Sequence, residues 1–237
     1  MEIREQLYQG KAKRVFATDD ESLVLVDYGD DATAGNGAKK GTIVGKGAVN
    51  NRMTNMLMQQ LAAKGVPNHF VRELDDRRTL VRKVQIVPLE VIVRNIAAGS
   101  LSARLGLEEG AVLARPVIEF CYKDDALGDP MVNDDHILAI GAATAEELAA
   151  IRRMALQVND FLRERMAGAG IELVDFKLEF GRTPDGEVIL ADEISPDTCR
   201  FWDSKTHAHL DKDLFRRDLG GAEEAYQEVL RRLMAQD

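Results

Sequence analysis

The stretch "ELVDFKLEFGRTPDGEVILADEISPD" (172–197) decides how the second half of this sequence folds. Its first part alternates apolar and charged residues, which is the period of a β-strand whose two faces differ. The apolar face carries Val174, Phe176, Leu178 and Phe180. The opposite face carries Asp175, Lys177 and Glu179. The pattern therefore predicts a strand that covers a core with one side and presents charges on the other.

The segment "GRTPDG" predicts a turn, and "EVILADEI" predicts the returning strand of a hairpin. A symmetric hairpin gives three cross-strand pairs, namely Glu179 with Val188, Lys177 with Leu190, and Asp175 with Asp192. Paired residues point to the same side, so we expect Asp192 on the charged face. The register is assumed, and a slip of one residue would reverse the second strand. A charged face exposed to solvent is the alternative.

Composition narrows the class of protein. The chain has 237 residues, of which 45% are apolar and 30% charged, and this is ordinary for a globular protein. The formal charge of −9 argues against nucleic-acid binding, which needs a basic face. Cys121 and Cys199 fit a reducing compartment, and we find neither a membrane-spanning run nor a signal peptide. We expect a cytoplasmic protein with no membrane partner.

The first 84 residues predict a small β-rich lobe. Residues 7–28 form an expected hairpin, and a glycine-rich loop follows at 29–47, of a length that is usually functional or disordered. A helix is expected at 48–65 and β-rich runs at 69–74 and 79–87. Pro88 breaks the pattern, so we place a domain boundary near Val84–Pro88. The predicted domains are 1–84 and 85–237.

The second domain combines strands and helices. A strand at 89–96 leads into a short helix, for which Ser100 is the expected N-cap. The longest helix opens with a capping box of Thr144 and Glu147, and a last amphipathic helix lies in 220–237. The fold class is α+β, with antiparallel sheets, flanking helices and a cleft between two lobes.

Two segments suggest phosphate binding. In "YQGKAKRV" (8–15), a strand would place Lys11 and Lys13 on one face and the small Gly10 and Ala12 on the other, which suits a polyphosphate. A solvated edge strand has the same pattern. In "VRNIAAGSLSARLG" (93–106), Gly99 and Ser100 precede a helix and Arg94 lies upstream. The alternative is a capped helix with a surface arginine and no binding role.

The acids point to a metal. Carboxylates such as Glu179 and Asp192 are hard oxygen ligands that suit Mg²⁺ held partly by phosphate. Basic groups, a metal site and a glycine-rich loop are what phosphoryl transfer requires. The segment "YKDDALGDPMVND" (122–134) reads as a solvated loop or as a turn that fixes Asp129 at a cleft edge. These residues alone indicate an enzyme acting on a magnesium nucleotide.

Six blocks in order resemble one family over essentially the whole chain. They are "YQGKAKRVF", "ATAGNGAKKGTIVGKGAVNN", "VPLEVIVRNIAAGSLSARLG", "KDDALGDPMVNDDH", "LVDFKLEFG" and "LADEISPDTCRFWD". The family is SAICAR synthetase, or phosphoribosylaminoimidazole-succinocarboxamide synthase, of de novo purine biosynthesis. The resemblance implies an ATP- and Mg²⁺-dependent ligase that joins L-aspartate to carboxyaminoimidazole ribonucleotide (CAIR), releasing ADP and phosphate. It also implies a two-lobed fold related to ATP-grasp enzymes, with ATP between the lobes, and a homo-oligomer, expected to be a dimer.

The resemblance assigns roles to individual residues. It implies that the ATP phosphates are covered by Gly10, Lys11, Ala12 and Lys13. It implies that adenine contacts the backbone of Val81, Arg82, Lys83 and Val84. The implied metal ligands are Glu179 and Asp192. The CAIR phosphate would bind Arg94, Ser100 and Arg200. The catalytic residues Asp175 and Lys177 would lie near the imidazole part of CAIR, with Lys123 and Asp129 lining the substrate cleft. Lys11 and Lys13 would stabilise the transferred phosphoryl group, and Asp175 is the candidate proton acceptor.

Two positions depart from the family pattern, and two other classes of protein remain open. Asn36 stands where an acid is expected in many members, and Thr33 where serine is common, so the role of that loop is undetermined. One alternative is another ATP-dependent transferase with a kinase-like arrangement of lobes, which would lack the paired phosphate pocket. The other is a nucleotide-binding module without catalysis, which would bind ATP but not turn it over.

Overall fold

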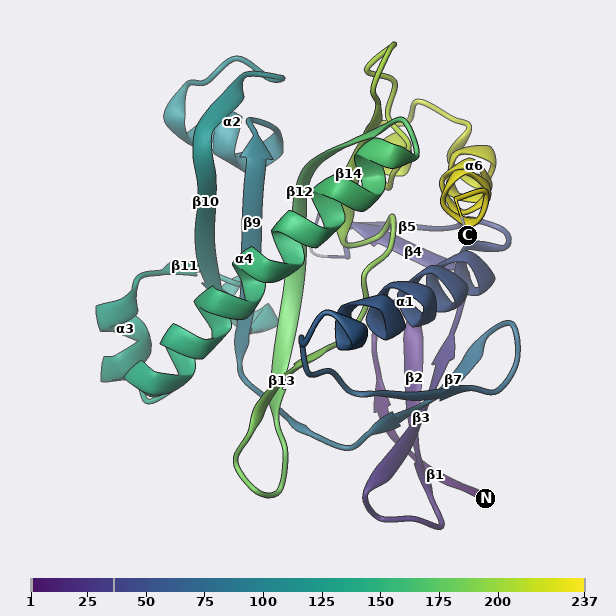
Figure 1. Ribbon diagram of the computed structural model, residues 1–237, viewed down its shortest axis with the longest axis vertical. Helices are drawn as coiled ribbons and strands as arrows, with labels where there is room; N and C mark the ends of the chain where they lie inside the picture. The colour runs from purple at the N-terminus through teal and green to yellow at the C-terminus, as the bar shows by residue number, and fades with distance from the viewer. Residues whose placement is uncertain (1, 36, 237) are drawn as a thin grey trace.

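The computed structural model describes residues 2–35 and 37–236, so the expectation about Asn36 lies outside the described residues. The N-terminal sheet is antiparallel with the order β1-β2-β3-β7-β6 (Figure 1). Its strands are β1 (Ile3–Gln9), β2 (Lys13–Thr18), β3 (Leu23–Tyr28), β6 (Phe70–Glu73) and β7 (Arg78–Arg82). The strand at one edge, β1, is exposed along its whole length.

The second sheet follows the order β11-β10-β9-β12-β13, and β8 and β14 also pair with β12. Its strands are β8 (Gln85–Ile86), β9 (Leu89–Ile96), β10 (Val112–Tyr122), β11 (Met131–Val132), β12 (Ile171–Arg182), β13 (Val188–Ala191) and β14 (Cys199–Asp203). The chain therefore passes from one sheet to the other between Arg82 and Gln85. The predicted domain division at residue 84 falls in this connection and stays a prediction.

Helices pack against both sheets. They are α1 (Lys46–Ala63), α2 (Gly99–Leu105), α3 (Asp134–Ala139), α4 (Ala145–Gly168), α5 (Asp213–Arg216) and α6 (Ala222–Met234), with a 3₁₀ turn η1 (Asp125–Leu127). In Figure 1, α4 crosses the face of β9 and β12, while α1 lies over the N-terminal sheet near α6. The predicted capping box of α4 is confirmed, because Thr144 and Glu147 satisfy each other's backbone N–H groups.

The main core lies on one face of the second sheet. It is built by side chains of α1, α4 and α6 packed on alternate residues of β9 and β12. On β9, Leu89, Val91 and Val93 enter this core, so the residues between them face the other way. On β12, Phe176, Leu178 and Phe180 do the same. The predicted division of β12 into an apolar and a charged face is therefore confirmed for these residues.

Val174 does not follow the predicted alternation. Pairing with β14 shifts register between Leu173 and Asp175, so one extra residue stands in β12 at this point. As a result, Val174 packs in a separate apolar cluster with Ile96 and Trp202.

The predicted hairpin register is wrong. Glu179 pairs with Ala191, and Arg182 pairs with Val188. The turn is longer than a symmetric hairpin allows: Thr183 bonds Glu187 through both its backbone and its side chain. An odd shift of three residues would turn Asp192 toward the core. Asp192 instead follows the end of β13 with a left-handed φ of 60°, and its carboxylate reaches Lys177 on the charged face. The predicted location is right, but for a different reason.

Two predictions for the first lobe need correction. Residues 7–28 form three strands and not one hairpin, because the chain leaves β1 at Gln9, bends, and begins β2 at Lys13. The glycine-rich segment 29–47 has structure of its own, since it contains a hairpin of β4 (Asp31–Ala34) and β5 (Lys39–Thr42). This hairpin is anchored where Lys39 donates to the carbonyl of Phe215 at 2.6 Å.

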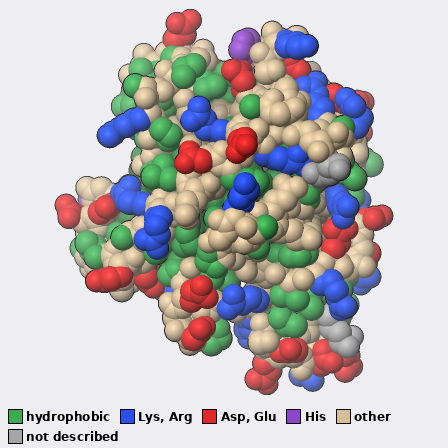
Figure 2. Space-filling view, viewed as in Figure 1, with side chains coloured by type: hydrophobic (Ala, Val, Ile, Leu, Met, Phe, Trp, Pro, Cys, Tyr) green, Lys and Arg blue, Asp and Glu red, His purple; other side chains and the backbone are tan. Residues whose placement is uncertain are grey.

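The surface carries charges of both signs. On the face seen in Figure 2, acidic and basic side chains are interspersed and form no continuous basic area. Among the described residues, no helix combines the length and the apolar character needed to cross a membrane. Cys121 and Cys199 are both free, and both are buried.

Candidate active site

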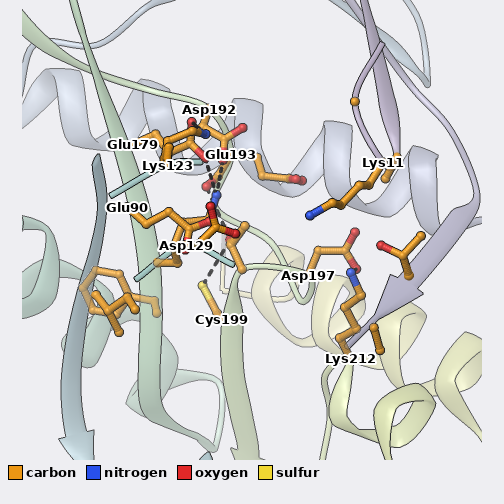
Figure 3. Close-up of a pocket in the computed structure, with 18 of the residues that line it drawn as sticks. Lys11, Glu90, Lys123, Asp129, Glu179, Asp192, Glu193, Asp197, Cys199 and Lys212 are labelled. Carbon is orange, nitrogen blue, oxygen red and sulfur yellow. Dashed lines mark hydrogen bonds and ion pairs between the residues drawn. The ribbon is translucent and has the colours of Figure 1, made fainter. Parts of the chain in front are cut away.

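One large cleft of about 840 Å³ is lined by the β1–β2 turn, the β4–β5 hairpin and the charged faces of β9 and β12 (Figure 3). The predicted site residues that line it are Gly10, Lys11, Ala12, Lys13, Arg94, Ser100, Lys123, Asp129, Asp175, Lys177, Glu179, Asp192 and Arg200. The segment Val81–Val84 is not among its described lining residues; it runs from the end of β7 toward β8. The structure thus brings every predicted site residue except this segment to one cavity.

Carboxylates and ammonium groups alternate at one end of the cleft. Lys177 donates from Nζ to Glu179 Oε1 and to Asp192 Oδ2, both at 2.7 Å. The other oxygen of Glu179 lies 2.6 Å from Lys123 Nζ. The other oxygen of Asp192 accepts from Lys13. One lysine therefore holds together an acid within β12, Glu179, and an acid just after β13, Asp192.

Charge stabilises this cluster despite its burial. Burial by itself would lower the pKa of the Lys177 ammonium, but the carboxylates of Asp192 and Glu179 outweigh burial and raise it. Burial would likewise raise the pKa of Asp192, and the ammonium groups of Lys13 and Lys177 lower it instead. The pKa of Lys13 is raised in the same way, because Asp192 and Glu193 outweigh its burial. Lys13, Lys177 and Asp192 are therefore ionised at neutral pH.

Two arginines meet at the second end of the cleft. Arg94 Nη1 and Arg200 Nη1 both donate to Asp175 Oδ2, at 2.7 and 2.9 Å. Each arginine has a further buried anchor: Arg94 Nε donates to Glu119 at 2.7 Å, and Arg200 Nε donates to Asp213 at 2.9 Å. Because each guanidinium group is held on two sides, its orientation is fixed before any ligand arrives. A pair of such groups suits a phosphate.

The start of α2 packs against this arginine pair. The helix begins at Gly99, its N-cap is Ala98, and no side chain caps it, so the prediction that Ser100 is the N-cap is wrong. Ser100 Oγ instead accepts from Arg94 Nη2 at 2.9 Å. Gly99 has a φ of 53°, and a Cβ placed there would lie 2.6 Å from Arg200 Nη2. Glycine at this position allows the backbone to approach the guanidinium group closely.

Lys11 and Lys13 do not extend from one strand face, which corrects a second prediction. Lys11 lies in the bend between β1 and β2, where its side chain is 53% exposed and donates to Asp125 at 3.0 Å. This hydrogen bond raises the pKa of Lys11. Lys13 opens β2 and points inward to Asp192 and Glu193. One lysine therefore lies at the mouth of the cleft and the other in its interior.

Comparison with known proteins identifies the family. The model of the SAICAR synthetase family matches residues 6–233. The chain belongs to the SAICAR synthetase family. A phosphoribosylaminoimidazole-succinocarboxamide synthase of Lachnoclostridium phytofermentans is 60% identical over 233 residues, which cover 98% of this chain and 99% of that protein.

Solved SAICAR synthetases share the whole fold. The crystal structure of the Ehrlichia chaffeensis enzyme superimposes with a TM-score of 0.95 at 45% identity, covering 98% of this chain and 99% of that one. A SAICAR synthetase in complex with ADP gives a TM-score of 0.94 at 45% identity, with 98% of each chain covered. The two-lobed fold predicted from the sequence is therefore confirmed.

Sequence reasoning missed several lining residues of this SAICAR synthetase cleft. Glu90 lies on β9 two and four residues before Ile92 and Arg94, so strand alternation would have placed it on the cleft face. Burial raises the pKa of its carboxyl group. Glu193 follows Asp192 and lies 3.3 Å from Lys13 Nζ. No periodic signal points to Lys212, because it lies in a connection that only the tertiary fold brings to the cleft.

The donor set fits a magnesium ion. Glu179 and Asp192 offer carboxylate oxygens, the ligands that Mg²⁺ prefers. One oxygen of each lies 2.7 Å from the same Lys177 nitrogen, so the two acids converge on a point where a positive charge is already stabilised. Among the described residues, the only group of three metal-ligating side chains within 4.8 Å of one another is His209, Asp211 and Asp213, away from these acids. A metal at Glu179 and Asp192 would thus need further oxygens, such as those of phosphates.

Proposed function

We propose that this cleft performs the ligation of the SAICAR synthetase family through an acyl phosphate. The chain is an ATP-dependent ligase of purine biosynthesis that joins L-aspartate to CAIR. A carboxylate is a poor acceptor for an amine, because its leaving group would be oxide. Transfer of the ATP γ-phosphoryl group to the CAIR carboxylate forms a carboxyl–phosphate bond and releases ADP. Attack by the aspartate amine then forms the amide and releases phosphate.

Lys11 and Lys13 stabilise the transferred phosphoryl group in this proposal. Both line the cleft, one at its mouth and one inside, so together they span the depth that a triphosphate must enter. Their role is electrostatic, since phosphoryl transfer depends mainly on positioning and charge. The connection Val81–Val84 is proposed to bind adenine through its backbone, at the point where the chain passes between the sheets.

The proposed binding site of the CAIR phosphate is the arginine pair. Arg94, Ser100 and Arg200 are fixed around one point at the end of the cleft opposite Glu179 and Asp192. This pocket and the carboxylate–lysine cluster lie in the same cavity. That coexistence is the observation that favours a ligase with a phosphorylated substrate over a kinase-like transferase, which needs no second phosphate pocket. Lys123, Asp129 and Lys177 would then contact the imidazole part of CAIR.

Magnesium is proposed to bind Glu179 and Asp192. When bound, it would offset the negative charge of the ATP phosphates during transfer. The two carboxylates would hold the ion, while Lys13 and Lys177, which now pair with Asp192, would be free to contact phosphate oxygens.

Asp175 is poorly placed to accept the proton of the aspartate amine. Asp175 was the sequence candidate, but its carboxylate oxygens already accept from both Arg94 and Arg200. An amine that approached Asp175 would have to displace a buried arginine. We therefore propose that Asp175 holds the two arginines at their spacing. A cytoplasmic location and a homodimer are further proposals, supported by the two free cysteines and by the family resemblance.

Release of ADP by the purified protein tests this function. The assay contains ATP, Mg²⁺, CAIR and L-aspartate, and each component is omitted in turn. We expect ADP release to require all four and to yield a succinocarboxamide product of the expected mass. Release that proceeds equally without CAIR would overturn the proposal. Bound ATP without any release would indicate a nucleotide-binding module.

A further inference from the structure

We propose that Lys212 binds a carboxylate group of L-aspartate. This inference rests on the proposed function and extends it, because none of the roles above gives that substrate a cationic partner. Lys212 lies just before α5, where its backbone N–H donates to the carbonyl of Pro196 at 3.1 Å. Its side chain is only 13% exposed and lines the cleft.

The neighbouring carboxylate, Asp197, already accepts hydrogen bonds from three other side chains. Its Oδ2 accepts from Lys46 Nζ at 2.7 Å and from Asn50 at 3.1 Å. Its Oδ1 accepts from the Tyr226 hydroxyl at 2.6 Å. Lys212 Nζ lies 4.0 Å from that same Oδ1, beyond hydrogen-bond distance. Within residues 2–35 and 37–236, no side-chain hydrogen bond of Lys212 is found, and its side chain lines the cleft.

The local charge is unbalanced in favour of an anion. Lys46 and Lys212 both face Asp197. Glu193 also acts on Lys212 but is paired with Lys13, and the cation Arg216 is held by Asp213 at 2.6 Å. A mostly buried ammonium group without a hydrogen-bond partner is unfavourable, and an anionic ligand would relieve this cost. In keeping with this environment, burial lowers the pKa of Lys212.

The chemistry favours an amino-acid carboxylate over a phosphate. The two fixed arginines with Ser100 already form a complete phosphate pocket, while Lys11 and Lys13 serve the triphosphate. Lys212 offers one compact ammonium group, which matches the single charge of a carboxylate better than a dianionic phosphate. Figure 3 shows Lys212 and Asp197 on the opposite side of the drawn pocket from Glu179 and Asp192. The third substrate, a dicarboxylic acid, therefore has a place of its own.

Steady-state kinetics of Lys212→Met tests the assignment. We expect the KM for L-aspartate to rise at least about tenfold, the effect of losing one charge-assisted hydrogen bond, while the KM values for CAIR and ATP change little. Lys212→Arg should restore part of the affinity for L-aspartate. Lys205→Met, which removes an exposed lysine nearby in sequence, is the matched control and should leave all three KM values unchanged.

Each other outcome is informative. A KM that rises for CAIR and not for L-aspartate would overturn the inference and assign Lys212 to the phosphate. Three unchanged KM values in an active variant would also overturn it. A wild-type protein with no aspartate-dependent ADP release would instead refute the proposed function itself.

A second measurement does not depend on the folding of a variant. In the wild-type protein with ADP and CAIR, acetylation of Lys212 can be followed by mass spectrometry. L-aspartate should slow the reaction of Lys212 and leave that of Lys205 unchanged. Equal labelling of Lys212 with and without saturating L-aspartate would overturn the inference.

Discussion

Gly99→Ala is expected to damage the proposed phosphate pocket without removing any polar group. Gly99 has a left-handed φ of 53°, and an added Cβ would lie 2.6 Å from Arg200 Nη2 and 2.9 Å from its Cζ. Ordinary contacts begin near 3.4 Å, so the guanidinium group must move by roughly 0.8 Å. Arg200 cannot move freely, because Asp175 and Asp213 hold it from two sides.

The magnitude has two parts. The left-handed backbone costs an alanine about 1–2 kcal/mol of folding stability. The displaced guanidinium group loses the geometry of a charge-assisted hydrogen bond to phosphate, which is worth about 1.5–3 kcal/mol. The second part corresponds to a KM for CAIR that is roughly ten to a hundred times higher. The KM for ATP should not change, because Lys11 and Lys13 are not in contact with this residue.

Gly106→Ala supplies a matched control at the other end of α2. Gly106 also has a left-handed φ, of 65°, but a Cβ there meets nothing within 4 Å. This variant should therefore show the same loss of stability in urea unfolding and an unchanged KM for CAIR. If Gly99→Ala kept a wild-type KM for CAIR, or if Gly106→Ala raised it equally, the proposed contact between the α2 backbone and the phosphate-binding arginine would be refuted.

Three further predictions concern single groups. Burial lowers the pKa of His69 to about 4, so its neutral form stabilises the fold above pH 6.5. Up to roughly 3 kcal/mol of the free energy of unfolding is lost as the pH falls to 4. In urea unfolding at pH 7 and pH 4, His69→Gln should lose less stability than wild type, and an equal loss would contradict the shift. Asp125→Asn removes an exposed ion pair with Lys11 and should change the free energy of unfolding by less than about 0.5 kcal/mol in the same assay; a change above about 1 kcal/mol would show that this pair is structural. Glu179→Gln should abolish most turnover while the melting temperature stays within a few degrees, and near-normal activity at saturating Mg²⁺ would remove Glu179 from the metal site.

Local patterns predicted those parts of the structure that depend on neighbouring residues in sequence. The capping box of Thr144 and Glu147 defines the start of α4, because its hydrogen bonds span three residues. Alternation in β12 correctly placed Lys177 and Glu179 opposite Phe176 and Leu178. Both signals are short-range, so they do not depend on how the chain folds elsewhere.

Local patterns could not predict strand register or contacts between segments far apart in the sequence. The β12–β13 pairing depends on the hydrogen bonds of Thr183 within the turn, and a symmetric count of residues cannot include them. Asp192 points toward the cleft because its own backbone is left-handed, and no glycine in the sequence indicates this conformation. Lys212 reaches the cleft only through the tertiary fold, in which Asp213 at the start of α5 accepts a hydrogen bond from Arg200 on β14. The family resemblance found Arg200 where periodicity had not.

The charge arrangement explains how a chain with a net charge of −9 can serve anionic substrates. The cations of the cleft are not surplus charges, because Lys13, Lys177, Arg94 and Arg200 each pair with a carboxylate of the protein. A phosphate that binds there exchanges one anionic partner for another, and no buried cation is left alone before it arrives. The binding energy is then the difference between two pairings, which keeps the site ordered and lets products leave. Lys212 has a weaker pairing than these cations, since its nearest carboxylate, Asp197, lies 4.0 Å away and already accepts hydrogen bonds from other groups. The ammonium group of Lys212 has no hydrogen-bonded carboxylate of the protein, and this is best explained by a ligand that supplies the negative charge.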